Sequence, residues 1–215
     1  MINLLKLHGR QKELLRLRIR RWNGLVRIFV HPLYEKWRWP SGEYATHPDY
    51  KQLANIESVL SRLIAMPEGK TPPIIIMEEQ DRLAHIQRWL KENLAGHSQK
   101  NVYYVSTLRN DPRPVIENLS YWKKEEAWKR LIKRLDSISV KRILIGGMQF
   151  RVCGYRSDWT QRGPFVDKCV GITISYLSKD KAGHFELDLS TLVDCSRSRQ
   201  IYIQYVNETR LSVAG

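Results

Sequence analysis

The sequence predicts an α/β protein with one doubly wound, mostly parallel sheet and helices on both faces, a three-layer, Rossmann-like arrangement. Two observations carry this prediction. After a basic first helix, predicted strands and helices alternate four times before two late strands, and such alternation implies parallel strands joined by helical crossovers. Residues 74–77 and 143–145 are continuous apolar runs, as expected of strands covered on both faces.

The first predicted element is a basic amphipathic helix over residues 1–22, followed by a break at Asn23-Gly24. The segment holds seven Lys and Arg residues and one Glu, a net charge of +6. One face of this helix is apolar and contains Leu5, Leu15, Ile19 and Trp22. Because no repeat or linker follows, we expect residues 1–24 to form the N-terminal helix and residues 25–215 to form a single α/β domain.

The next predicted element is a strand over residues 25–31, a run rich in β-branched side chains that ends at Pro32. An irregular aromatic loop is expected over residues 33–47, and a loop of this length is often functional.

The remaining elements follow from apolar spacing and from proline or glycine stops. Helices are predicted over residues 48–65, 80–95, 120–136 and 164–179. Strands are predicted over residues 74–77, 102–105, 143–145, 185–189 and 201–205. Residues 110–114 and the polar segment between Gly147 and Gly163 are predicted to be loops, and Pro164 suits the first turn of the last helix.

The composition excludes a disordered chain and favours anionic partners. Of the 215 residues, 42% are hydrophobic, and the formal net charge is +14. That apolar content is too high for disorder. The charge favours nucleic acid, a membrane surface or small phosphates and carboxylates as partners, and a basic surface that is merely solvated is the alternative.

The three cysteines, Cys153, Cys169 and Cys195, show neither a disulfide framework nor a zinc-binding spacing. We therefore predict no metal site, and the cofactor stays unknown. No apolar run reaches the length of a signal peptide or a transmembrane helix. These observations lead us to expect a cytoplasmic protein without a transmembrane segment.

Polar residues follow the predicted strands where an open parallel sheet binds its ligands, beyond the carboxyl ends. His31 ends the first strand and Glu78-Glu79 the second. His31 and Glu79 are the candidate acid–base residues. The alternatives are a strand-end hydrogen bond for His31 and, for at least one of the glutamates, an interaction with the dipole of the following helix.

Ligand-binding candidates follow the third and fourth strands. Arg109 lies just beyond Ser106-Thr107, and its guanidinium could clamp an anion. Gly146 and Gly147 admit a close backbone approach, which suits a phosphate or a tight strand exit. Gln149 follows them and completes the set of predicted ligand-binding residues.

Two cysteines are candidate nucleophiles. Cys153 lies in a predicted polar loop near Arg151 and Arg156, and neighbouring cations lower the pKa of a thiol. Cys169 falls about five residues inside the predicted helix that starts at Pro164, where burial as a small apolar side chain is the expected role. Cys153 is therefore the preferred reactive thiol.

Residues 143–153, with the sequence ILIGGMQFRVC, resemble the strand–glycine–loop–cysteine segment of isochorismatase-like cysteine hydrolases. The resemblance implies a doubly wound sheet and assigns the nucleophile to Cys153. The family also has an Asp after its first strand and a Lys after its third, where this chain has His31-Pro32 and Ser106-Thr107. The residues after Cys153 do not continue as the helix that the family has there.

Two functional hypotheses result. The first is a small, anionic ligand bound at the carboxyl edge of the sheet, with a hydrolase or transferase reaction if the protein is an enzyme. The second is a nucleic-acid-binding module that uses residues 1–22 and the basic face of helix 120–136. This face contains Lys123, Lys124, Lys129, Lys133 and Arg134. For residues 1–22 an anionic membrane surface or simple packing against the sheet are the alternatives.

Overall fold

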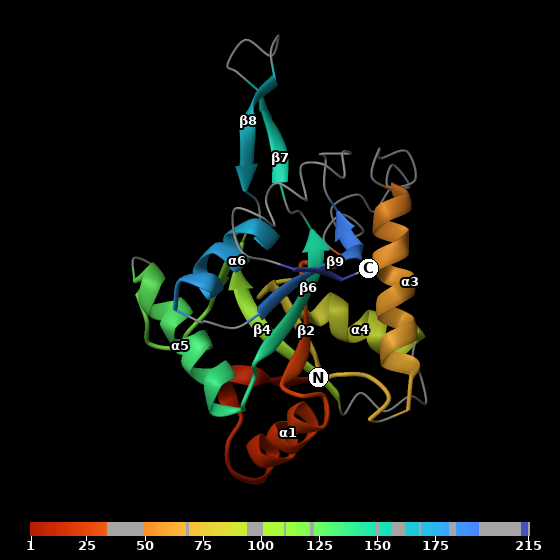
Figure 1. Cartoon of the computed structure of the whole chain (residues 1–215), viewed down its shortest axis with the longest axis vertical. Coiled ribbons are helices and arrows are strands. Elements are labelled where there is room, and N and C mark those ends of the chain that lie inside the picture. The colour runs from red at the N-terminus through yellow and green to blue at the C-terminus, as the bar shows by residue number, and fades with distance from the viewer. Residues whose placement is uncertain are drawn as a thin grey trace.

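The structure, a computed structural model, describes a set of segments that includes most of the chain. They are residues 1–33, 50–67, 69–93, 101–109, 111–120, 123–148, 151–155, 162–167, 169–180, 184–193 and 212–214. Within them the chain forms one mostly parallel sheet with helices around it (Figure 1). The predicted α/β class is therefore confirmed.

The main sheet has the strand order β1-β4-β3-β2-β6-β9-β10, and β5 pairs with β4. Its strands are β1 (Ile2–Asn3), β2 (Leu25–Val30), β3 (Ile74–Glu79), β4 (Val102–Leu108), β5 (Asp111–Pro114), β6 (Arg142–Met148), β9 (His184–Val193) and β10 (Ser212–Ala214). Every pair in it is parallel except β4–β5.

The strand order places a topological switch point between β2 and β6. From β2 the chain proceeds to β3 and β4 on one side of the sheet, and then returns to β6 and β9 on the other side. The strands β2, β3, β4, β6 and β9, taken in chain order, thus lie in the Rossmann-type order 3-2-1-4-5. In open sheets of this kind the ligand crevice opens where the order reverses, at the carboxyl ends of the strands.

Helices cover both faces of the sheet (Figure 1). They are α1 (Gly9–Arg21), α3 (Tyr50–Ala65), α4 (Leu83–Asn93), α5 (Lys124–Ser137) and α6 (Cys169–Asp180), with a short 3-10 turn, η1 (Leu4–Lys6), before α1. Buried residues of α1, α5 and α6 share one core cluster, and those of α3 and α4 share another. No helix in these segments is both long and apolar enough to cross a membrane.

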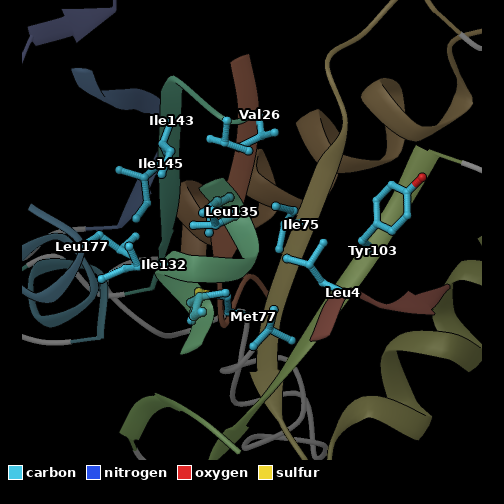
Figure 2. Close-up of a cluster of buried hydrophobic side chains, with 14 of the residues drawn as sticks. Leu4, Val26, Ile75, Met77, Tyr103, Ile132, Leu135, Ile143, Ile145 and Leu177 are labelled. Atoms are coloured by element: carbon cyan, nitrogen blue, oxygen red, sulfur yellow. The ribbon is translucent and has the colours of Figure 1, made fainter. Parts of the chain in front are cut away.

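Strand β2 shows how the sequence produces the two cores. Val26, Ile28 and Val30 belong to the cluster under α1, α5 and α6, whereas Phe29 belongs to the cluster under α3 and α4. Successive side chains of a strand point to opposite faces, so an apolar run fills both cores. Figure 2 shows part of the first cluster, where Leu135 of α5 lies among Val26, Ile75 and Ile143 from three strands.

The N-terminal segment differs from the prediction of one helix over residues 1–22. The Oδ1 atom of Asn3 accepts a hydrogen bond from the N–H of Leu5 at 2.9 Å and so caps the separate turn η1. Helix α1 then begins at Gly9, whose φ is +49°. Leu15 and Ile19 are buried against the sheet as expected.

The prediction of a helix beginning at residue 164 is wrong. Residues Arg162–Asp167 form strand β8, which pairs antiparallel with β7 (Arg151–Tyr155), and α6 begins only at Cys169. Pro164 does suit a first helical turn, but Phe165 and Val166 pair instead with residues of β7. A proline is tolerated in such a strand at an edge.

Three further predictions differ from the structure or fall outside the described residues. Residues 111–114 form strand β5, which pairs with β4 after a register shift, instead of the predicted loop. The predicted strand over residues 201–205 and nearly all of the aromatic loop 33–47 lie outside the described residues.

Candidate functional site

Three parallel strands bring polar side chains to the carboxyl edge of the sheet. Glu79 of β3 and Thr107 of β4 are register partners, and His31 directly follows β2. The Nε2 atom of His31 lies 3.0 Å from the Oγ1 atom of Thr107. Because β3 lies between β2 and β4, this hydrogen bond bridges the end of β3.

His31 is held in a buried, uncharged state. Its backbone takes a left-handed conformation with φ +47°, and its N–H donates to the carbonyl of Met77 at 2.8 Å. The imidazole is 1% exposed. Burial, assisted by the positive charge of Arg82, lowers the pKa of His31 to about 3. The ring is therefore neutral at physiological pH and acts as a hydrogen-bonding group.

The two adjacent glutamates, Glu78 and Glu79, are both fully buried and have different contacts. Burial raises the pKa of Glu78 to about 8, and the negative charge of Glu79 adds to this shift. The Oε1 atom of Glu78 accepts from the backbone N–H of Glu79 at 2.9 Å, and within the described residues its Oε2 atom has no hydrogen-bond partner. The Oε2 atom of Glu79 lies 2.9 Å from Nε of Arg82 in an ion pair, but without hydrogen-bond geometry.

A second ion pair lies beside this edge, on β5. Arg113 is 3% exposed, and its guanidinium contacts the carboxylate of Asp111 at 2.5 Å. The sequence reading missed Arg113 because Asp-Pro-Arg-Pro looked like a loop. The predicted anion ligand, Arg109, is exposed in the turn between β4 and β5.

The predicted glycine pair lies inside β6 and not at a strand exit, because the strand continues to Met148. Gly147 has φ +118° and pairs with Val30 of β2. A Cβ atom added to it would overlap the carbonyl oxygen of Val30 and lie 2.6 Å from its nitrogen. The close approach made by Gly147 is thus to the neighbouring strand. Gln149 lies outside the described residues, and the ligand-binding role of all three residues stays a prediction.

The two candidate thiols occupy different parts of the fold. Cys153 lies on β7, opposite Phe165 of β8, in a hairpin that stands away from the main sheet (Figure 1). Cys169 is the first residue of α6 and is partly exposed, not buried within a helix as predicted. Since α6 joins the carboxyl end of β6 to the amino end of the parallel strand β9, its first turn lies at the carboxyl edge of the sheet.

No group of three His, Cys, Asp or Glu side chains in the described segments is arranged to bind a metal ion.

Comparison with known proteins supports the fold. No protein-family model matches the sequence, and no curated protein matches it. Among solved structures, the chain is similar to nicotinamidase PncA from Bacillus subtilis, with a TM-score of 0.51 and 10% sequence identity over 89% of this chain and 99% of that chain. At this identity the likeness shows a shared α/β fold alone.

Proposed function

We propose that the protein binds a small anionic ligand at the carboxyl edge of its sheet and acts on it as a hydrolase or transferase. One observation carries the proposal: His31, Glu78, Glu79 and Thr107 are all buried at the carboxyl ends of β2, β3 and β4, where the side chain of His31 contacts that of Thr107. Strongly shifted pKa values gather at functional sites, because burial and charge are arranged there for chemistry. The fold shared with a nicotinamidase supports a hydrolase.

The charges of the cluster suggest a role for each group. Glu78, with a pKa of about 8, keeps its proton at neutral pH and is suited to donate it. The ion pair of Glu79 with Arg82 would orient the ligand. His31 would hydrogen-bond to the ligand or position Thr107 without carrying charge. Arg109, exposed just beyond β4, would meet the negative charge of the ligand.

A thiol is the candidate nucleophile in this proposal, and two cysteines compete for the role. The family resemblance assigned Cys153 and required a helix directly after it. In this chain the helix that follows β6 begins at Cys169, at the carboxyl edge, where the helix N-terminus favours negative charge on the reacting sulfur. Cys169 is therefore the first choice, and Cys153 is kept as the second.

Hydrolysis assays test this assignment. The purified protein is incubated with nicotinamide and with a panel of small carboxamides and carboxylic esters, and released ammonia or acid is measured. We expect Cys169→Ser to lower kcat/KM by at least about a thousandfold, as loss of a nucleophile does. Cys195→Ser serves as the matched control and should retain activity.

The outcomes of these assays identify the nucleophile and test whether the protein binds such a ligand. If Cys153→Ser abolishes hydrolysis and Cys169→Ser does not, the nucleophile is Cys153. If Cys153→Ser, Cys169→Ser and Cys195→Ser all stay active, no single thiol is the nucleophile, and loss of activity in Glu78→Gln becomes the test of acid–base chemistry. If no compound of the panel is hydrolysed and none raises the melting temperature, the ligand proposal is wrong.

Nucleic-acid binding is the second candidate, and one observation favours it: the two basic segments lie side by side. Arg134 of α5 donates hydrogen bonds to the carbonyls of Leu5 and Leu7 in the N-terminal segment, so their cations share one surface. We expect fluorescence anisotropy with labelled DNA to show an affinity that falls steeply with salt, with a log–log slope of about −2 or steeper. Undetectable binding at low ionic strength would exclude this candidate.

A further inference from the structure

A cavity of about 380 Å³ lies between the N-terminal segment and α5, away from the carboxyl-edge cluster. Its lining combines two apolar residues with four cations and one hydroxyl: Leu5, Ile116, Lys12, Arg130, Lys133, Arg134 and Ser137. Among the residues that the structure describes, the lining includes no carboxylate. Its volume lies within the range of about 300–1,000 Å³ that is common for small-molecule sites.

Hydrogen bonds hold the walls of this cavity in place. The Nη1 and Nη2 atoms of Arg134 donate to the carbonyls of Leu7 at 3.0 Å and Leu5 at 2.8 Å. Lys6 forms an ion pair with Glu117, next to the lining residue Ile116. These contacts join the N-terminal segment to α5 and to the chain that follows β5, and they hold Arg134 in place before any ligand arrives.

The positive charge of the cavity is poorly neutralised by the protein itself. Arg130 pairs with Glu126 at 3.1 Å, but both side chains are about half exposed, and such exposed pairs contribute little. Lys133 is exposed and Lys12 is half-buried. Like charges that converge on one concave surface repel one another, and an anionic ligand with several charges relieves that repulsion.

We infer that this cavity binds a small ligand that carries two or more phosphate groups together with an apolar or aromatic part, the chemistry of a nucleoside di- or triphosphate. Lysine and arginine side chains contact phosphate oxygens in charge-assisted hydrogen bonds. Leu5 and Ile116 supply the apolar surface for the rest of the ligand. None of the lining residues belongs to the carboxyl-edge cluster, so this is a second, independent site.

Calorimetric titration with ATP, at low ionic strength and without divalent metal, tests the inference on the whole chain. The informative variant is Lys12→Ala/Lys133→Ala, and the matched control is Lys124→Ala/Lys129→Ala. Both remove two charges, but Lys124 and Lys129 are exposed α5 residues outside the lining. We expect the cavity pair to weaken ATP binding about tenfold or more, and the control pair to weaken it less than about threefold.

Two further probes distinguish a nucleotide ligand from an inorganic polyphosphate and from a polynucleotide. Tripolyphosphate should bind more weakly than ATP, because it lacks the part that covers Leu5 and Ile116. A short oligothymidylate should bind no more tightly than ATP. Equal losses in both lysine pairs, or no ATP binding by the unmodified chain, would overturn the inference. It would also be overturned if only the oligothymidylate bound and its binding depended on the cavity pair, because the site would then serve a polynucleotide.

Discussion

Replacing Gly147 with alanine is expected to lower the free energy of unfolding by more than about 4 kcal/mol, a loss reserved for severe steric or packing defects. The added Cβ would overlap the Val30 carbonyl oxygen and lie 2.6 Å from the Val30 nitrogen, so backbone must move. The φ of +118° is also one that alanine rarely adopts. Urea unfolding followed by circular dichroism measures the loss.

Gly9→Ala is the matched control for this variant. Gly9 also has a positive φ, +49°, but nothing lies within 4 Å of its added Cβ. Only the backbone preference is then lost, which costs about 1–2 kcal/mol. Similar losses in the two variants would mean that β2 and β6 separate easily at the switch point. A much larger loss at Gly147 would show that this contact fixes the crevice on which the proposed ligand site depends.

The class of the fold could be predicted from the sequence because local patterns determine it. Buried parallel strands leave apolar runs such as residues 74–77, and the burial of these residues is confirmed. The structure adds that their strand has a parallel neighbour on each side. The start of α6 could not be predicted, because Pro164 fits both a first helical turn and an edge strand. Pairing of Phe165 and Val166 with β7 decides between them, and the sequence around Pro164 does not reveal that pairing.

The candidate site could be predicted only in part, because contacts between separate segments of the chain also decide it. The rule that ligands bind beyond the carboxyl ends of parallel strands pointed to His31 and Glu79 without any motif. It could not tell that burial raises the pKa of Glu78 or that Glu79 forms an ion pair with Arg82, because both depend on the side chains that the fold places around each carboxylate. Arg113 was missed because β5 forms by pairing with β4, a contact that local composition does not encode.

Glu78→Gln is expected to make the protein more stable than the unmodified chain at pH 8 and to change its stability little at pH 4.5. In the folded protein the pKa of Glu78 is raised from 4.5 to about 8. Between these values the folded state holds a proton that the unfolded state has lost. The unfolded state then binds fewer protons, so the free energy of unfolding falls by about 1.4 kcal/mol per pH unit as pH rises. Glutamine, which does not ionise, removes that decline.

His31 produces the opposite slope in both proteins. Its folded pKa is lowered from 6.5 to about 3, and its contribution to stability is therefore lost as pH falls from 6.5 toward 3. In the unmodified chain the effects of His31 and Glu78 on the slope cancel between pH 4.5 and 6.5. Because both proteins contain His31, its effect drops out of the stability difference between Glu78→Gln and the unmodified chain, which should grow from about pH 4.5 to pH 8.

Urea unfolding at pH 5, 6.5 and 8 measures that difference, with Glu125→Gln, at an exposed position of α5, as the control for removal of a carboxylate. A difference that stays constant from pH 6.5 to 8 would mean that Glu78 is already ionised in the folded protein. A carboxyl that is ionised at neutral pH has no proton to donate. The same measurement therefore decides whether Glu78 can serve as the general acid of the proposed site.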